Sequence, residues 1–404
     1  MELVTRLHFL ATRNSQLATN MKVAHIITRL ILGGAQENTV YSCIDLARRH
    51  GATVRLFTGP TTGPEGSLVK FAKEQGVNLV EIPSLIRAIN PLYDVPAYFQ
   101  IRKALKEFAP DVVHTHSAKA GILGRAAAHS LRIPLIVHTI HGAPWYPSGN
   151  FLSRSFNQIC ERWAAKRCHK LVSVADAMTQ LFLDAHIAPA EKFTTIYSGM
   201  DVEPFLNSAP LREPVRQEYG FQPDDVVIGK IARLFRLKGH DDLIAAAKTV
   251  CNKNDRVKFL LVGDGILRQS LEDAVRRAGL TDRFVFAGLV PANRIPAMIS
   301  AMDVVVHTSL REGLARVLPQ ALISGKPVVS YDIDGAREVV LTDKTGYLIP
   351  PRDIDRLAES LLLLADDPQK RAQFGQTGRE LFTDQFRREL MADRLMELYR
   401  EIIN

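Results

Sequence analysis

One stretch, residues 303–331, restricts the fold of this chain more than any other. Asp303 is followed by the β-branched run Val304 to Val306, which is typical of a strand buried on both faces of a parallel sheet. A loop, HTSLREG, leads into a helical segment that ends at Gly325, where a C-cap glycine belongs. The segment KPVVSYD then predicts a second strand. Strand, helix and strand together predict an α/β protein built on a parallel sheet.

The loop of this unit is where we expect a ligand. Glu312, Gly313 and Leu314 lie between the carboxyl end of the strand and the start of the helix. Ligands of open α/β sheets bind at that edge. A helix that begins there offers unpaired N–H groups and positive partial charge to an anion.

The same stretch resembles the retaining glycosyltransferases of family 4. Their motif is a glutamate, seven residues and a second glutamate, in a frame like EGFGLPLLEA-x-x-x-GKPV. Glu312 fills the first position and the sequence GKPV from Gly325 is kept, but Gln320 stands in the second position. The resemblance implies that Glu312 meets hydroxyls of a donor sugar and that Gln320 meets the ribose as a neutral, weaker acceptor. A surface glutamate and glutamine in an ordinary βαβ unit remain the alternative.

The length of 404 residues predicts two domains. The resemblance implies the GT-B fold, in which two doubly wound Rossmann-like domains face a central cleft. We expect an acceptor-side domain at 21–205, a nucleotide-sugar domain at 206–385, and a final helix at 386–404 that crosses back to the first domain. Residues 1–20 precede a natural domain start at Met21, so they are either an extension or the product of an over-called start codon.

The first domain opens with a strand, a glycine-rich loop and a helix. A GxGxxG fingerprint is absent from the sequence, which disfavours a nicotinamide cofactor. The resemblance assigns Gly34 to the donor phosphate and Gly33 to the acceptor side, although a plain tight turn explains both glycines equally well. Residues 84–97 contain Pro91 and Pro96 and are predicted to be a loop.

Histidines close two successive strands of this domain. His114 and His116 end one strand, and His138 and His141 end the next. A histidine just past a parallel strand is well placed for a ligand, and its near-neutral pKa suits proton donation. The resemblance places His141 near the donor sugar and diphosphate, as a catalytic residue, and we expect His116 with Lys119 on the acceptor side. Hydrogen bonding in the core would explain His114 and His116 as well.

The second domain begins with a strand that ends at Arg233. Lys238 follows five residues later, and such a pair of cations at a strand end can neutralise a diphosphate. The resemblance gives both residues that role and assigns the turn at Asp264 and Gly265 to the nucleotide. Two ordinary surface cations are the alternative.

We expect no metal and no cofactor. The four cysteines are scattered without a CxxC pair, so neither a zinc site nor a disulfide framework is indicated, and a reducing cytoplasm fits best. Two D-x-D triplets, 332–334 and 353–355, match a metal motif of another glycosyltransferase fold, but the first follows a strand and the second precedes a helix like an N-cap. We therefore interpret both triplets as coincidental.

The net charge of +8 suits anionic partners such as nucleotide diphosphates or acidic lipids. No run of 18 apolar residues is present, and no nucleic-acid module is visible. The segment 151–170 predicts a basic helix with Trp163, which is suited to an anionic membrane surface or, as the favoured reading, to a solvated face.

Together these features predict a retaining glycosyltransferase of the hexosyltransferase type that uses a nucleotide diphosphate sugar, with UDP as the first choice. The segments SLIRAINPLYD, HTHSAKAGILGR and HTIHG resemble enzymes that build exopolysaccharide or capsule on a lipid diphosphate carrier. We therefore expect a glycan or lipid-linked acceptor and a cytoplasmic protein at the inner membrane face. A nucleotide-sugar 2-epimerase of the same architecture and a non-catalytic sugar-binding subunit, which Gln320 favours, are the alternatives.

Overall fold

The computed structural model describes residues 21–61, 66–145 and 150–403. The expected extension at 1–20 lies outside the described residues. The chain forms two compact units, of which the first holds the residues up to Met200 together with those from Arg387 onward, and the second holds Asp201–Phe386. This division differs by a few residues from the expected boundaries at 205 and 385.

The first unit contains a seven-stranded sheet in the order β3-β2-β1-β4-β5-β6-β7. All of its strand pairs are parallel. The order reverses between β1 and β4, which creates the point at which ligands of doubly wound sheets bind. The strands are β1 (Lys22–Ile27), β2 (Thr53–Thr58), β3 (Asn78–Glu81), β4 (Val112–His116), β5 (Leu135–Ile140), β6 (Lys170–Ser173) and β7 (Phe193–Thr195).

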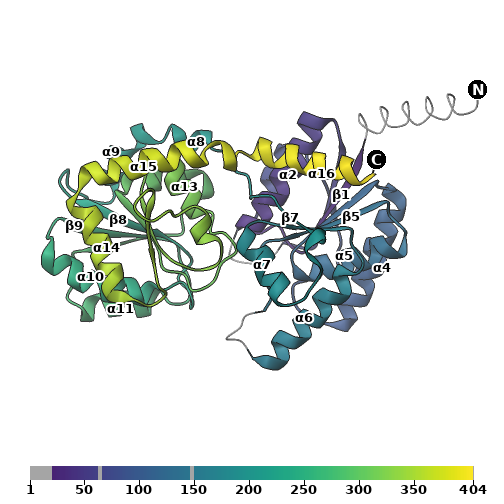
Figure 1. Ribbon diagram of the computed structural model, residues 1–404, viewed down its shortest axis with the longest axis horizontal. Helices are drawn as coiled ribbons and strands as arrows, with labels where there is room; N and C mark the ends of the chain where they lie inside the picture. The colour runs from purple at the N-terminus through teal and green to yellow at the C-terminus, as the bar shows by residue number, and fades with distance from the viewer. Residues whose placement is uncertain (1–20, 62–65, 146–149, 404) are drawn as a thin grey trace, which may run out of the picture. The chain divides into compact units, whose positions relative to one another are not determined.

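Helices cover both faces of this sheet (Figure 1), because successive side chains of a strand point to opposite faces. In β1, Val23 and Ile27 enter a core formed with α2 and α16. Ala24 and Ile26 enter a second core, which includes residues of α4, α5 and α7. The helices are α2 (Gly34–His50), α3 (Val69–Glu74), α4 (Pro91–Phe108), α5 (Ala118–Ser130), α6 (Phe151–Ala165), α7 (Asp176–Asp184), the 3-10 turn η1 (Ala190–Lys192) and α16 (Arg388–Ile403).

The prediction of a loop at 84–97 was wrong, because α4 begins at Pro91. Asn90 caps this helix by accepting a hydrogen bond from the backbone N–H of Leu92 at 3.0 Å. Pro91 occupies the first turn, where a missing N–H costs no intrahelical bond. Pro96 lies inside the helix without ending it. The two prolines therefore start and enter a helix instead of preventing one.

The second unit contains a six-stranded parallel sheet in the order β10-β9-β8-β11-β12-β13. Its order reverses between β8 and β11. The strands are β8 (Val226–Ile231), β9 (Val257–Val262), β10 (Phe284–Gly288), β11 (Val304–His307), β12 (Val328–Tyr331) and β13 (Gly346–Ile349). The helices are α8 (Glu203–Leu206), α9 (Arg212–Glu218), α10 (His240–Lys253), α11 (Arg268–Arg277), α12 (Ile295–Ala301), α13 (Val317–Ile323), α14 (Ile354–Asp366) and α15 (Pro368–Phe382), with 3-10 turns η2 (Ala209–Leu211), η3 (Ala292–Arg294), η4 (Asp334–Glu338) and η5 (Asp384–Phe386).

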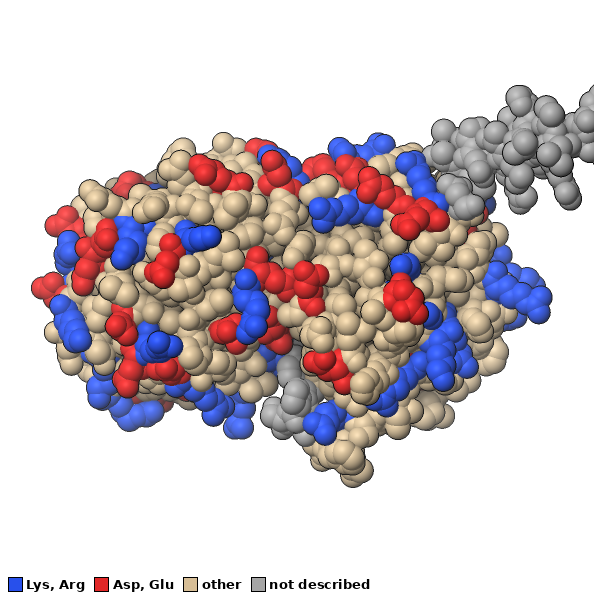
Figure 2. Space-filling view, in the orientation of Figure 1, with Lys and Arg blue, Asp and Glu red and all other residues tan. Residues whose placement is uncertain are grey.

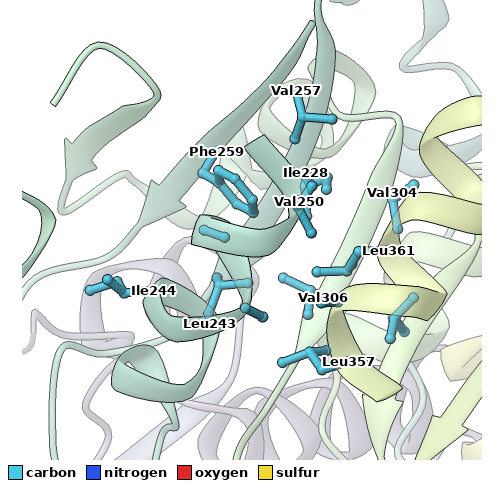
Figure 3. Close-up of a cluster of buried hydrophobic side chains, with 14 of the residues drawn as sticks. Ile228, Leu243, Ile244, Val250, Val257, Phe259, Val304, Val306, Leu357 and Leu361 are labelled. Atoms are coloured by element: carbon cyan, nitrogen blue, oxygen red, sulfur yellow. The ribbon is translucent and has the colours of Figure 1, made fainter. Parts of the chain in front are cut away.

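A core of aliphatic and aromatic side chains lies on one face of this second sheet (Figure 3). Ile228 of β8 and Val306 of β11 point into it, together with Leu243 of α10 and Leu357 of α14. Burying each such side chain contributes about 1.5–3 kcal/mol. The neighbouring strands β8 and β11, which lead into the loops of the site described below, both contribute side chains to this core.

Asp303, which opens β11, fixes the start of that strand against β8. Its carboxylate accepts hydrogen bonds from Arg212 at 2.7 Å, from Arg216 at 3.2 Å and from the backbone N–H of Val227 at 2.8 Å. Arg216 is only 2% exposed, so this acid neutralises a buried guanidinium.

Candidate active site

In the second unit, the loops after β8 and β11 bring a lysine and a glutamate together. Lys238 donates a hydrogen bond to Oε1 of Glu312, and the two side chains form an ion pair. Both residues were predicted as site residues from separate stretches of sequence. They meet because parallel strands end at the same edge of a sheet, and β8 pairs with β11.

The backbone of the Glu312 loop is held by the turn that follows β12. The backbone N–H of Glu312 donates to the carboxylate of Asp334 at 2.7 Å, and the carbonyl of Gly313 accepts from Gly335 at 2.9 Å. Asp334 adopts a left-handed backbone with φ of 44°, which is uncommon outside glycine and marks a constrained turn. The expectation of helical N–H groups directly after Glu312 was wrong, because α13 begins only at Val317. Gly313 and Leu314 instead belong to an irregular loop.

A buried lysine supports the loop that carries Lys238. Lys230 of β8 is 1% exposed and donates to Oγ1 of Thr308 at 2.8 Å. The hydroxyl of Thr308 donates in turn to the carbonyl of Gly239 at 2.6 Å. Gly239 has φ of 63°, and a Cβ there would lie 2.0 Å from the carbonyl oxygen of Thr308. Only glycine fits this close approach, so the backbone beside Lys238 has one arrangement.

Burial and close charges set the protonation states of the site. Burial alone would raise the pKa of Glu312, but His307 and Lys238 beside the carboxylate lower it to about 2. Burial lowers the pKa of His307, whose Nε2 lies 3.8 Å from Oε1 of Glu312. Burial, and then the charge of Lys238, lower the pKa of Lys230 to about 7. Near neutral pH the carboxylate of Glu312 is therefore ionised.

The other predicted donor residues lie in the same unit. Arg233 is exposed and stacks over the ring of Phe235 at 5.1 Å. The carbonyl of Asp264 accepts from the backbone N–H of Leu234 at 3.0 Å, so the turn with Gly265 lies against the Arg233 loop, and its assignment to the nucleotide stays a prediction. Gln320 is half-buried on α13, and among the described residues no hydrogen bond joins its side chain to Glu312.

In the first unit, three predicted histidines and one unpredicted histidine meet on one face of the sheet. Both ring nitrogens of His114 form hydrogen bonds. Nε2 lies 2.6 Å from Oγ1 of Thr139, and Nδ1 bonds to the hydroxyl of Tyr399 on α16. His25 Nδ1 lies 2.9 Å from Nε2 of His116, and His116 Nδ1 lies 3.1 Å from Nε2 of His141. This row, His25–His116–His141, is called the histidine chain below.

The proton positions in the histidine chain follow from one buried atom. Burial lowers the pKa of His25 to about 3 and holds the pKa of His116 well below 6.5, so both rings are neutral. Nε2 of His25 is buried and has no hydrogen-bond partner among the described residues. A buried N–H without a partner is rarer than an unpaired acceptor, so we infer that the proton is on Nδ1. His25 then donates to His116, and His116 donates to Nε2 of His141.

The expectation that His116 faces an acceptor was wrong. Its side chain has no exposed surface, and it contacts His25, His114 and His141. Any effect of His116 on a substrate must therefore pass through His141. Lys119, the other expected acceptor-side residue, is 11% exposed and is bound to Asp94 and to the carbonyl of Ala88.

The glycine-rich loop lies at the start of α2. Gly33 is the N-cap residue, and its carbonyl accepts from the backbone N–H of Glu37 at 3.0 Å. Gly34 is the first residue of this 17-residue helix. The N–H groups of its first turn have no partner within the helix, and the assignment of Gly34 to a donor phosphate stays a prediction.

The nitrogens of His25, His114 and His116 lie within 4.8 Å of one another. The rings of His114 and His116 are stacked with centroids 4.5 Å apart, and the nitrogens are engaged in the hydrogen bonds given above. Stacked rings do not direct their lone pairs at one point, which a metal needs. The D-x-D triplets have structural partners: Asp332 pairs with Arg337, and Asp353 caps α14 as predicted, by accepting from the N–H of Arg356 at 3.0 Å.

Sequence reasoning missed several residues that support the Lys238–Glu312 pair or the histidines of the first unit. They are Lys230, His307, Thr308, Asp334, His25 and Tyr399. Period-2 alternation would have placed His25, His114, His116 and Thr139 on one face, because β1, β4 and β5 pair in the register His25 with His114 and His116 with Thr139. A lysine inside an apolar strand, as in VVIGKIA, was also a visible signal of an unusual buried charge.

Two family models match the chain, one to each unit. "Glycosyltransferase Family 4" matches residues 32–204, and "Glycosyl transferases group 1" matches residues 212–381.

Relatives and solved structures agree with these matches. A UDP-Gal:alpha-D-GlcNAc-diphosphoundecaprenol alpha-1,3-galactosyltransferase of Escherichia coli is 28% identical over 86% of this chain and 89% of its own. A GDP-mannose-dependent alpha-mannosyltransferase of Mycobacterium tuberculosis is 29% identical over 83% of this chain and 85% of its own. The structure of Anabaena HepE with UDP and glucose has a TM-score of 0.78 and 24% identity, over 94% of this chain and 99% of its own. That likeness shows the two-domain GT-B fold.

Proposed function

The chain is a member of glycosyltransferase family 4, and on this premise we propose that it transfers a sugar, with retention of anomeric configuration, from a UDP-sugar to a hydroxyl of a lipid-linked glycan. The observation that carries the proposal is the pair formed by Lys238 and Glu312 at the carboxyl ends of β8 and β11. The pair combines a cation for a diphosphate with an ionised acceptor for sugar hydroxyls, on loops that are held by hydrogen bonds to Asp334 and Thr308.

The difficult step is the departure of the nucleoside diphosphate from the anomeric carbon. Arg233 and Lys238 stabilise the negative charge that develops on the leaving oxygens. Donor binding would separate Lys238 from Glu312, so that the amine turns to phosphate and the carboxylate to the sugar. A carboxylate with a pKa of about 2 accepts hydrogen bonds at any physiological pH and does not act as a general acid.

Retention follows in this proposal from attack on the same face that the leaving group departs from. Glu312 orients the sugar, the acceptor hydroxyl attacks the anomeric carbon, and the leaving phosphate oxygen takes the hydroxyl proton. His141 donates a hydrogen bond to the sugar or to the diphosphate, with its tautomer set by His116. A trapped covalent sugar–protein adduct would contradict this mechanism.

We propose that the reaction needs no metal ion, because Arg233 and Lys238 already supply two positive charges to the diphosphate. Complete loss of turnover in EDTA, with recovery on adding magnesium, would contradict that part of the proposal.

The choice of UDP and of a lipid-linked acceptor draws on the relatives. The Escherichia coli relative is named for UDP-galactose and a diphosphoundecaprenol acceptor, and HepE was solved with UDP and glucose. Another relative, EpsD of Bacillus subtilis, is 25% identical over 71% of this chain and 76% of its own, and it carries the name of a glycosyltransferase alone. We infer a role in surface polysaccharide synthesis, with the protein in the cytoplasm and in contact with the inner membrane face. No described helix is long and apolar enough to cross that membrane.

The test is a thermal-shift and turnover screen of UDP-, GDP- and ADP-sugars with wild type, Glu312→Gln and Lys238→Met. We expect a UDP-sugar to stabilise the wild type and to be cleaved slowly, and we expect both variants to lose cleavage. Losing the charged hydrogen bond of Lys238 should cost about 1.5–3 kcal/mol, or roughly 10- to 100-fold in rate. NMR of the product assigns its anomeric configuration.

Glu218→Gln is the matched control, because Glu218 pairs with Arg294 at 2.6 Å on the surface of the same unit. It should behave as wild type. Stabilisation by no nucleotide sugar would contradict the proposal. Conversion of the donor alone to an isomer would favour a 2-epimerase, and binding of the donor without cleavage or transfer would favour a non-catalytic sugar-binding subunit.

A further inference from the structure

Helix α6 of the first unit presents a stripe of large apolar side chains to solvent. The spacings of four, three and four residues place the last four of them, from Leu152 to Trp163, on one face of the helix. They are between 43% and 75% exposed. The stripe comprises Phe151, Leu152, Phe156, Ile159 and Trp163.

The opposite face of α6 is what holds it to the sheet. Ala164 and Ala165 are buried, and Glu161 forms a buried ion pair with Arg125 at 2.8 Å. Since Glu161 is the one acidic residue between 150 and 170, the exposed part of this helix carries no negative charge. The apolar stripe therefore takes no part in packing α6 against the rest of the unit.

Basic residues accompany the stripe. Arg154, Arg162, Lys166 and Arg167 lie on α6 or directly after it, and Arg167 stacks over the ring of Trp163 at 3.7 Å. Figure 2 shows the surface of this part of the first unit largely as uncharged tan with Lys and Arg beside it. An apolar face flanked by cations is the arrangement of helices that lie in the interface of anionic bilayers.

Helix α4 continues the same surface. Leu92, Val95 and Phe99 are 82%, 56% and 60% exposed and lie on one face of the helix. A groove of about 480 Å³, whose lining includes Val95 on α4 and Trp163 on α6, joins the two helices. Contiguous apolar surface on this scale marks an interaction site.

We propose that the exposed faces of α6 and α4 together form the surface by which this protein binds bilayers that contain anionic lipids. Of the two readings that the sequence allowed for 151–170, the exposed stripe favours membrane docking over a solvated face. In this arrangement the cations bind acidic lipid headgroups and the apolar side chains enter the acyl region. Trp163 with Arg167 lies at the boundary between the two regions. Arginine and aromatic residues are also common in protein interfaces, but cations without an acidic residue on the exposed part of α6 match an anionic surface better. The benefit of membrane binding, access to a lipid-linked acceptor, rests on the proposed function. The binding itself can be measured independently of that function.

The test is co-sedimentation of the full chain with vesicles of phosphatidylethanolamine containing phosphatidylglycerol, and with neutral phosphatidylcholine vesicles. We expect wild type to bind the anionic vesicles at least tenfold more tightly than the neutral ones, and less tightly in high salt. The triple variant Leu152→Ser, Phe156→Ser, Ile159→Ser should bind the anionic vesicles at least tenfold more weakly. Tryptophan fluorescence should shift to shorter wavelength on binding, and Trp163→Phe should remove that shift.

The matched control is Leu289→Ser, Leu363→Ser, Leu381→Ser, which removes three exposed leucines from the second unit and should bind as wild type does. Equal vesicle binding by both triple variants, or no binding by wild type, overturns the proposal. So does a wild-type dimer that the α6 variant converts to a monomer, because the surface would then join two copies. Cleavage of nucleotide sugar in the absence of lipid should be unchanged in the α6 variant, so a failure of this proposal is distinguishable from a failure of the proposed function.

Discussion

Replacing Lys230 by methionine should stabilise the second unit and impair catalysis. Lys230 is 1% exposed, and its burial lowers its pKa from 10.5 to about 7. Because one pKa unit corresponds to about 1.4 kcal/mol, keeping this amine charged at neutral pH costs the folded state about 4 kcal/mol. Losing the hydrogen bond to Thr308 offsets about 1 kcal/mol, and methionine is close to lysine in volume. The net gain should be about 3 kcal/mol at pH 7.

The pH dependence separates this cause from better packing. Between about pH 7 and 10.5 the unfolded chain binds the proton that folded Lys230 has lost, so the unfolding free energy of wild type rises with pH. The advantage of Lys230→Met is complete below pH 7 and should shrink to near zero by pH 9.5. Urea unfolding followed by circular dichroism at pH 7.0 and 9.5 measures both differences.

Lys248→Met, which removes an exposed lysine from α10, is the control and should change stability little at either pH. The same preparations should show that transfer falls in Lys230→Met, because Thr308 then loses the donor that orients its hydroxyl toward the Lys238 loop. A less stable Lys230→Met variant, or an equal gain at both pH values, would refute the reasoning.

Three further substitutions test other parts of the site. Gly239→Ala should lower donor affinity at least tenfold in a thermal-shift titration, because the new Cβ would lie 2.0 Å from a carbonyl oxygen. The control is Gly279→Ala, which has φ of 71° and open space around it and should leave donor affinity unchanged. Asp303→Ala should destabilise the protein by about 3–5 kcal/mol in urea, because it leaves a buried guanidinium unpaired. His116→Asn should lower kcat about tenfold with little change in the KM for the donor, because it changes the hydrogen bond that sets the tautomer of His141. A tenfold rise in KM would instead indicate lost donor binding.

Much of the fold was predictable because hydrophobic periodicity carries it. The β-branched strands, the glycine that ends the helix of the βαβ unit and the alternation of strand and helix gave two parallel sheets. Prolines misled the prediction at Pro91, where position within a helix matters more than residue type. The start of α13 was misplaced because apolar spacing alone does not show that residues 313–316 are held by the turn after β12.

The two residues that pair at the candidate site, Glu312 and Lys238, were predictable, and the residues that support them were not. Glu312 belongs to the glutamate motif after β11, and Lys238 belongs to the pair of cations after β8. Each residue could therefore be predicted from its own stretch of sequence. Lys230, Asp334 and Tyr399 act through contacts with residues far away in the chain, and a single sequence carries no signal of such pairs.

The order in which the chain is synthesised gives the helix α16 a further significance. The second unit is continuous from Asp201 to Phe386, whereas the first needs the residues from Arg387 onward. Met391, Leu395 and Tyr399 fill the core beside β1 and are added to the chain only after the whole of the second unit. During translation the second unit can therefore fold before the core of the first unit is complete, because that core needs α16. A chain that stops before Tyr399 would lack the hydroxyl that binds His114, so this histidine gains its second hydrogen bond only after α16 has been synthesised.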